Sequence, residues 1–173
     1  MGTAKATLLV DGEPLAWRGA RLLAELCDPV LEVGPGYSKL PTVDEPEPGR
    51  GPLAALVAGS EALGTESPVL LLACDLPFVT LELLTRLVES PGDGTVVPVD
   101  RDGIVQPVCA RYSAAARDRA RALLADGERS LRRLLDETEV TRLADIDGQA
   151  LVDVDTPDDA RRWGIRRPGS LDP

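Results

Sequence analysis

The segment from Pro68 to Asp75 reads Pro-Val-Leu-Leu-Leu-Ala-Cys-Asp and decides the fold class. Its apolar residues follow one another without interruption, which is typical of a strand covered on both faces in a parallel sheet. The run stops abruptly at Asp75. Because ligands bind at the carboxyl ends of strands in doubly wound sheets, Asp75 stands where a functional side chain is expected.

Strand and helix patterns alternate on both sides of this segment. We expect strands at 6–10, 30–33, 68–74, 96–99, 105–110 and 151–154, and helices at 15–26, 52–64, 80–88, 113–124, 130–135 and from 156 onward. Between them, Tyr37 to Arg50 is predicted to be a long loop rich in proline and acidic residues. The alternation predicts an α/β fold, a Rossmann-like mostly parallel sheet with helices on both faces.

The length and composition fit one folded domain. At 173 residues the chain is long enough for one buried core, and no linker divides it. We therefore expect a single domain over residues 1–164 and a frayed tail over 165–173. Aromatic residues make up only 3% of the chain, so the core must be built from leucine, valine and alanine.

The net charge restricts the partners. A formal charge of −10 disfavours nucleic acid, which needs clustered lysine and arginine to neutralise its phosphates. A small phosphate compound stays compatible, because one lysine or a magnesium ion can reverse the local field in a cleft.

The cysteines and the apolar runs indicate the compartment. Cys27, Cys74 and Cys109 are widely spaced in a chain without histidine, so we expect buried thiols and neither a disulfide framework nor a zinc site. No apolar run approaches the length of a membrane span, and we expect a cytoplasmic protein without membrane contact.

Two local features carry candidate chemistry, each with a structural alternative. Asp75 offers hard carboxylate oxygen to magnesium, which binds through one or two carboxylates plus substrate phosphates; alternatively, it is a turn or cap residue before Pro77. The glycines at 49 and 51 let the backbone approach a ligand and lead into a helix N-terminus that favours an anion; alternatively, they form a simple loop.

These features lie in motifs that resemble a known family. The segment from Asp44 to Leu56 begins Asp-Glu-Pro and ends Gly-Pro-Leu-Ala-Ala-Leu, and the segment from Leu72 to Phe78 reads Leu-Ala-Cys-Asp-Leu-Pro-Phe. Together they resemble the molybdenum cofactor guanylyltransferases and their cytidylyl-transferring relatives. The resemblance continues at Val97-Pro98, Gln106-Pro107, Tyr112, Gly127 to Leu131 and Asp153 to Pro157, and implies a nucleotide-diphospho-sugar transferase-like fold.

The beginning of the chain departs from the family pattern. Members usually start with a strand and a loop of the form Leu-x-Gly-Gly-x-Ser-x-Arg-Met-Gly-x-Asp-Lys; here Met1 to Ala6 match only its end, with Ala4 in place of the aspartate. The resemblance thus implies that the first strand and glycine-rich loop are missing, which would leave backbone groups of neighbouring strands unpaired. Either the start codon is internal to a longer gene, which the consistent pattern of the remaining chain favours, or the protein begins here and is impaired.

The resemblance implies roles for individual residues. Lys5 would bind the nucleotide phosphates, Asp44 the nucleotide, and Asp75 both magnesium and phosphate, so that Lys5 and Asp75 are the catalytic candidates. Weaker candidates are Asp153 and Asp155 near the metal or acceptor phosphate, and Gln106 on the acceptor side. The structural alternatives make Lys5 and Asp44 solvated surface charges, and make 153–159 a helix start with Thr156 as N-cap.

The implied reaction is transfer of GMP from magnesium-bound GTP to the terminal phosphate of molybdopterin, with release of pyrophosphate and no covalent enzyme intermediate. Without the glycine-rich loop, weak transfer by this chain is expected. A cytidylyl or sugar-phosphate nucleotidyltransferase of the same fold stays open, because the residues that read the base partly belong to that loop. A non-catalytic partner that contacts other cofactor-biosynthesis proteins through its acidic surface is the alternative of another class, although retention of Lys5, Asp44 and Asp75 favours an enzyme.

Overall fold

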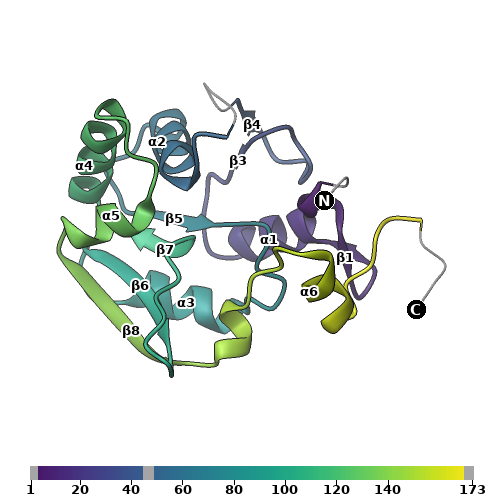
Figure 1. The fold of residues 1–173 in the computed structure, drawn as a ribbon. Helices are drawn as coiled ribbons and strands as arrows, with labels where there is room; N and C mark the ends of the chain where they lie inside the picture. Colours follow the sequence, from purple (N-terminus) through teal and green to yellow (C-terminus); the bar gives the residue numbers. More distant parts are fainter. Residues whose placement is uncertain (1–3, 45–48, 170–173) are drawn as a thin grey trace.

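The computed structural model describes residues 4–44 and 49–169. Its main sheet has four strands in the order β5-β7-β6-β8 (Figure 1). Their bounds are Val69–Leu72 for β5, Thr95–Asp100 for β6, Cys109–Tyr112 for β7 and Val140–Ile146 for β8. Because β7 is antiparallel to both of its neighbours and β8 is parallel to β6, three of the four strands run in the same direction.

Helices cover both faces of this sheet, which confirms the predicted α/β class. One face packs against α1 (Leu15–Ala24) and α3 (Leu81–Glu89), the other against α2 (Pro52–Leu63), α4 (Ala114–Ala125) and α5 (Leu131–Asp136). Adjacent residues in each strand point to opposite faces, so Val96 lies in the core beside α3 and Val97 in the core beside α2 and α4. Among the described residues no helix has the length and apolar character to span a membrane.

The ends of these helices follow from local chemistry. Thr80, Ser113 and Ser130 each accept a hydrogen bond from a first-turn amide, as N-cap residues do. Helix α2 starts with Pro52 and ends with Leu63, where Gly64 follows with a φ of 58°, the left-handed conformation that glycine adopts without strain. The predicted helices are therefore confirmed, with small shifts at their ends.

The N- and C-terminal segments pack together at one side of the molecule (Figure 1). The first contains a 3-10 turn at Lys5–Thr7 and a hairpin of β1 (Leu9–Val10) and β2 (Glu13–Pro14). The second contains a 3-10 turn at Gly148–Leu151 and helix α6 (Pro157–Arg162). Leu8, Val154 and Ile165 form their shared core.

Three of the strand predictions are wrong in part, and the extent of the tail stays a prediction. The strand predicted at 6–10 is shortened to Leu9–Val10 by the 3-10 turn at Lys5–Thr7. The stretch 151–154 is not a strand: Leu151 ends a second 3-10 turn, and residues 152–154 have no regular secondary structure. The strand predicted at 105–110 starts only at 109. The tail predicted from 165 is held in place at its start, since Leu9 and Arg166 exchange backbone hydrogen bonds of 2.8 and 2.9 Å; residues 170–173 lie outside the described part of the chain.

Three strands escaped prediction, namely β2, β4 and β8, and one is less buried than expected. Strand β4 (Thr42–Val43) lies in the predicted loop and pairs in parallel with β3 (Glu32–Val33), forming a separate small sheet. Strand β8 lies at the edge of the main sheet and was not predicted. Strand β5 is half-buried rather than covered throughout, because a cavity adjoins it. The cysteines also differ from expectation: Cys109 is buried, Cys27 half-buried and Cys74 exposed.

Candidate functional site

Asp75 follows the carboxyl end of β5, and a hydrogen bond to its backbone holds it in place. Its carbonyl oxygen accepts a hydrogen bond of 3.0 Å from the amide of Val154. Val154 is buried in the core that joins the two terminal segments. This contact brings the aspartates on either side of Val154, at 153 and 155, to the end of β5. The Asp75 side chain remains 26% exposed, so its carboxylate stays accessible.

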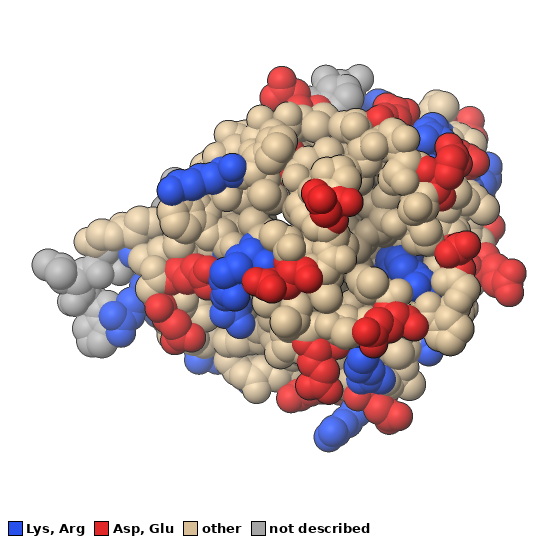
Figure 2. All heavy atoms as spheres, turned by 180° about the vertical axis from the view of Figure 1, so that it is seen from behind, with Lys and Arg blue, Asp and Glu red and all other residues tan. Residues whose placement is uncertain are grey.

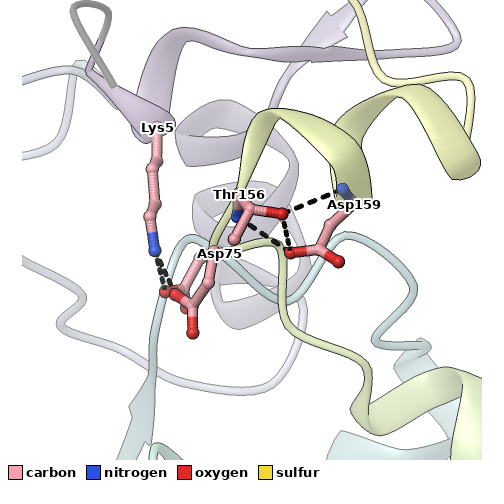
Figure 3. Close-up of polar contacts among 5 residues, drawn as sticks. Lys5, Asp75, Thr156 and Asp159 are labelled. Carbon is pink, nitrogen blue, oxygen red and sulfur yellow. Dashed lines mark hydrogen bonds and ion pairs between the residues drawn. The ribbon is translucent and has the colours of Figure 1, made fainter.

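Lys5 joins carboxylates from two distant parts of the chain. Its Nζ lies 3.4 Å from Oδ2 of Asp75 and also donates a hydrogen bond to Oδ1 of Asp155. Figure 3 shows the lysine side chain extending from the N-terminal segment toward Asp75. Partial burial would lower the pKa of Lys5, but the hydrogen bond to Asp155 and the charges of both aspartates outweigh it and raise the pKa above its ordinary value. Lys5 is therefore cationic at neutral pH.

Asp153 adds negative charge to this cluster. Partial loss of hydration raises the pKa of Asp153, and the charges of Asp155 and Asp75 raise it further, while Lys5 opposes them. Three carboxylates thus influence one another around a single ammonium group. Such a concentration of negative charge favours binding of a further cation.

The residues after Asp155 form the helix start, with Thr156 as N-cap, that the sequence offered as the structural alternative. The Thr156 hydroxyl accepts from the amide of Asp159, and the Asp159 carboxylate accepts from the amide of Thr156, which forms a capping box (Figure 3). Pro157 occupies the first turn. This cap fixes the backbone directly after Asp155 and leaves the Asp155 carboxylate to Lys5.

Gln106 and Asp44 take no part in these contacts. Gln106 donates from Nε2 to the carbonyl of Leu151 at 3.1 Å, which ties the loop before β7 to the turn that leads to Asp153. Asp44 is exposed after β4, and no contact within the described residues joins it to Lys5 or Asp75. Its neighbours Glu45 and Pro46 lie outside the described residues, as do Met1, Gly2 and Thr3.

Glu32 is a polar residue of this region that the sequence did not single out. Its carboxylate accepts hydrogen bonds from the amides of Gly36, Tyr37 and Ser38 and from the Ser38 hydroxyl. Partial burial would raise the pKa of Glu32, but these hydrogen bonds outweigh it and lower the pKa. The sequence signal was the Gly-Pro-Gly turn two residues after Glu32, which lets the chain fold back over the carboxylate.

The glycine-rich segment before α2 packs closely against the backbone at Arg129. A Cβ on Gly51 would lie 3.1 Å from the carbonyl oxygen of Arg129, and that oxygen accepts a hydrogen bond from the amide of Leu53. Glu128 in turn accepts from the amides of Arg129 and Ser130. Two separate motifs of the sequence, around 51 and around 129, therefore form one structural unit.

The acidic cluster is not a complete metal cage. Within residues 4–44 and 49–169, no group of three or more aspartate, glutamate, cysteine or histidine side chains is arranged to hold a metal ion. On the face drawn in Figure 2, the described basic side chains are scattered or lie beside acidic ones. This face has no broad basic surface of the kind that binds a polyanion.

The model of the MobA-like NTP transferase domain matches residues 1–143, more than three quarters of the chain. The chain belongs to this family. It is therefore a nucleotidyltransferase-family protein, as the sequence resemblance predicted. Asp153 and Asp155 lie beyond the matched range, and the structure brings them to Lys5 and Asp75 through the packing of the two terminal segments.

Individual relatives of the chain agree with this assignment. A probable molybdenum cofactor guanylyltransferase of Chloroflexus aggregans is 30% identical over 92% of this chain and 85% of its own length. One of Bacillus mycoides is 36% identical over 61% of this chain, a match that spans about half of that relative (52%). The solved structure of molybdopterin-guanine dinucleotide biosynthesis protein A from Archaeoglobus fulgidus has a TM-score of 0.70, with 20% identity over 94% of this chain and 89% of that one, and confirms the fold.

Proposed function

We propose that the protein transfers GMP from GTP to the terminal phosphate of molybdopterin and releases pyrophosphate. The names of the relatives support this reaction, and the one with 30% identity matches nearly the whole chain. The observation that carries the proposal is the cluster at the end of β5, where Lys5 contacts both Asp75 and Asp155. A cation beside two carboxylates is the arrangement expected where a metal-bound triphosphate is held.

The carboxylates fit a magnesium ion. Asp75 and Asp155 supply the hard oxygen ligands that magnesium prefers, and they already share one cation, the ammonium of Lys5. Partial burial is the main cause of the raised pKa of Asp153, and the charges of Asp155 and Asp75, which a divalent ion would offset, add to it. We assign Asp75 and Asp155 as its ligands. When bound, magnesium supplies charge neutralisation at the phosphates.

Lys5 stabilises the charge that develops during transfer. An oxygen of the acceptor phosphate forms a new bond to the α-phosphorus, and the bond from that phosphorus to the bridging oxygen breaks, so that pyrophosphate leaves with the electron pair. The Lys5 ammonium donates hydrogen bonds to phosphate oxygens and offsets their negative charge. Because its pKa is raised, Lys5 keeps its proton throughout. Alignment and charge neutralisation thus carry the reaction.

Release of pyrophosphate tests this proposal and its alternatives. The chain is mixed with molybdopterin, magnesium and either GTP or CTP, with the protein in excess over nucleotide so that a single slow turnover is detected. Pyrophosphate from GTP in preference to CTP supports guanylyl transfer. Preference for CTP would assign the protein to the cytidylyl-transferring alternative, and no product with either nucleotide would leave a non-catalytic binding role, which Ala4 at the aspartate position favours.

A further inference from the structure

The aromatic residues differ in how their rings are covered. The chain has two tryptophans, two tyrosines and one phenylalanine. The ring centroids of Phe78 and Trp163 lie 5.1 Å apart, and the ring of Tyr112 is buried. A lysine ammonium lies 4.0 Å from the centroid of the Trp17 ring. Among the described residues, Tyr37 is the aromatic residue that remains without such a contact, and it is 37% exposed.

Hydrogen bonds hold the backbone of Tyr37 from two sides. Its amide donates to Oε1 of Glu32 at 2.9 Å, and its carbonyl oxygen accepts from Nε1 of Trp17 at 2.8 Å. The amides of Gly36 and Ser38 also donate to the Glu32 carboxylate, so both neighbours of Tyr37 are fixed as well. The Tyr37 side chain itself makes no hydrogen bond within residues 4–44 and 49–169. A ring on a backbone that is already ordered binds a ligand at little cost in conformational entropy.

The contacts of this loop place Tyr37 beside the candidate site. Helix α1, which carries Trp17, packs against the 3-10 turn that contains Lys5. Tyr37 also borders the same cavity as Lys5 and Asp75. Strand β4 leads from the loop of Tyr37 directly to Asp44, the candidate for nucleotide binding. The exposed ring therefore lies on the side of the site where the sequence resemblance expects the nucleotide.

We propose that the ring of Tyr37 stacks on the base of the nucleotide whose phosphates Lys5 binds. This inference rests on the proposed function and adds a contact for the base, which Lys5 and Asp75 do not provide. Because every base has a π-face, stacking on Tyr37 strengthens the binding of GTP and of CTP alike and leaves the choice between them to other groups. The pterin ring of the acceptor is also planar, but the acceptor-side candidate Gln106 lies in a different loop, before β7.

Calorimetry of the full chain with magnesium compares GTP with inorganic tripolyphosphate, which has no base, and with molybdopterin. Tyr37→Ala removes the ring and should raise the Kd for GTP about tenfold, whereas Tyr37→Phe keeps the ring and should leave that Kd unchanged. Neither variant should change the Kd for tripolyphosphate or for molybdopterin. The matched control is Ile104→Ala, which removes a 56% exposed apolar side chain between β6 and β7 and should leave every Kd unchanged.

Nuclear magnetic resonance observes the ring directly in the wild type. A chain with isotopically labelled tyrosine rings gives signals from Tyr37 and Tyr112 only. Tyr112 is buried and its hydroxyl donates to the carbonyl of Pro107, so its signal is an internal reference. The ring current of a stacked base should shift the Tyr37 signal when GTP or CTP is added, and tripolyphosphate should leave that signal in place.

The outcomes distinguish this inference from the proposed function. A loss of GTP affinity in Tyr37→Ala without a loss for tripolyphosphate, together with a shifted Tyr37 signal, supports the inference. Equal GTP binding by the wild type and Tyr37→Ala overturns the inference and leaves the proposed function standing. So does a loss confined to molybdopterin, which would assign the ring to the acceptor, or an equal loss for tripolyphosphate, which would give the ring a structural role.

Absence of GTP binding by the wild type overturns the proposed function and the inference together. If Tyr37→Ala does not fold, the wild-type spectrum decides: a Tyr37 signal that GTP leaves in place overturns the inference, and one that GTP shifts while Tyr112 stays fixed supports it.

Discussion

Replacing Arg111 by methionine should destabilise the protein strongly. Arg111 lies in β7 and is only 6% exposed. Its guanidinium donates four hydrogen bonds of 2.8 to 3.2 Å to backbone carbonyls in the last turn of α3 and in the connection to β6, those of Val88, Ser90, Gly92 and Gly94. The single side chain therefore fixes the whole connection from α3 to the central strand.

The magnitude follows from these contacts. A hydrogen bond to a charged group contributes about 1.5–3 kcal/mol. Because Gly92 and Gly94 are exposed and Val88 and Ser90 are only half-buried, their released carbonyls regain water, and about 1 kcal/mol for each bond is appropriate. Methionine also avoids the cost of burying a charge, which offsets part of the loss. We expect the free energy of unfolding to fall by about 3 kcal/mol.

Urea denaturation followed by circular dichroism measures this loss. Arg142→Met is the matched control, because Arg142 is exposed on the edge strand β8, and its replacement should change the free energy of unfolding by less than about 0.5 kcal/mol. A loss below about 1 kcal/mol for Arg111→Met, with unchanged dependence on urea, would refute the reasoning that the guanidinium holds the turn.

Three further predictions concern the site and its supports. Lys5→Met should weaken magnesium-dependent GTP binding at least tenfold by calorimetry. Lys39→Met is the control and should leave this binding unchanged, because the Lys39 ammonium lies 4.0 Å from the Trp17 ring centroid. Equal effects of the two variants would contradict a phosphate role for Lys5. Thr156→Ala removes the capping box and should cost about 1 kcal/mol in urea denaturation, and an unchanged midpoint would show that the cap is dispensable. Because the folded pKa of Glu32 is depressed, its stabilisation is present above pH 4.5 and is lost as pH falls through the folded pKa. The wild type should therefore exceed Glu32→Gln in stability at pH 6 and lose that advantage in acid, and an advantage that persists at pH 2 would contradict this.

The helices could be predicted because their signals are local. Ser113 and Thr80 mark helix starts by their own side chains, and Gly64 marks an end by its backbone conformation. Strand β8 gave no such signal, since it carries Thr141, Arg142 and Asp145 on an exposed edge where apolar alternation is not required. The stretch 151–154 was misread because its apolar residues are buried by tertiary packing rather than by strand pairing.

The sequence singled out candidate site residues one by one, and their roles stay predictions, but it did not predict which of them contact one another. Asp75 was proposed from the end of an apolar strand, and Lys5 from its family motif. Their joint contact with Asp155 depends on the packing of Leu8 against Val154, between segments about 150 residues apart, which no local pattern encodes. The role of Asp44 stays a prediction that rests on the resemblance alone.

Calorimetric titration of the chain with GTP, with and without magnesium, tests the central claim most directly. Asp75→Asn is compared with Asp126→Asn, which changes an exposed carboxylate at the end of α4. The account predicts magnesium-dependent GTP binding that is lost in Asp75→Asn and kept in Asp126→Asn. GTP binding that needs no magnesium, or that survives in Asp75→Asn, would contradict it.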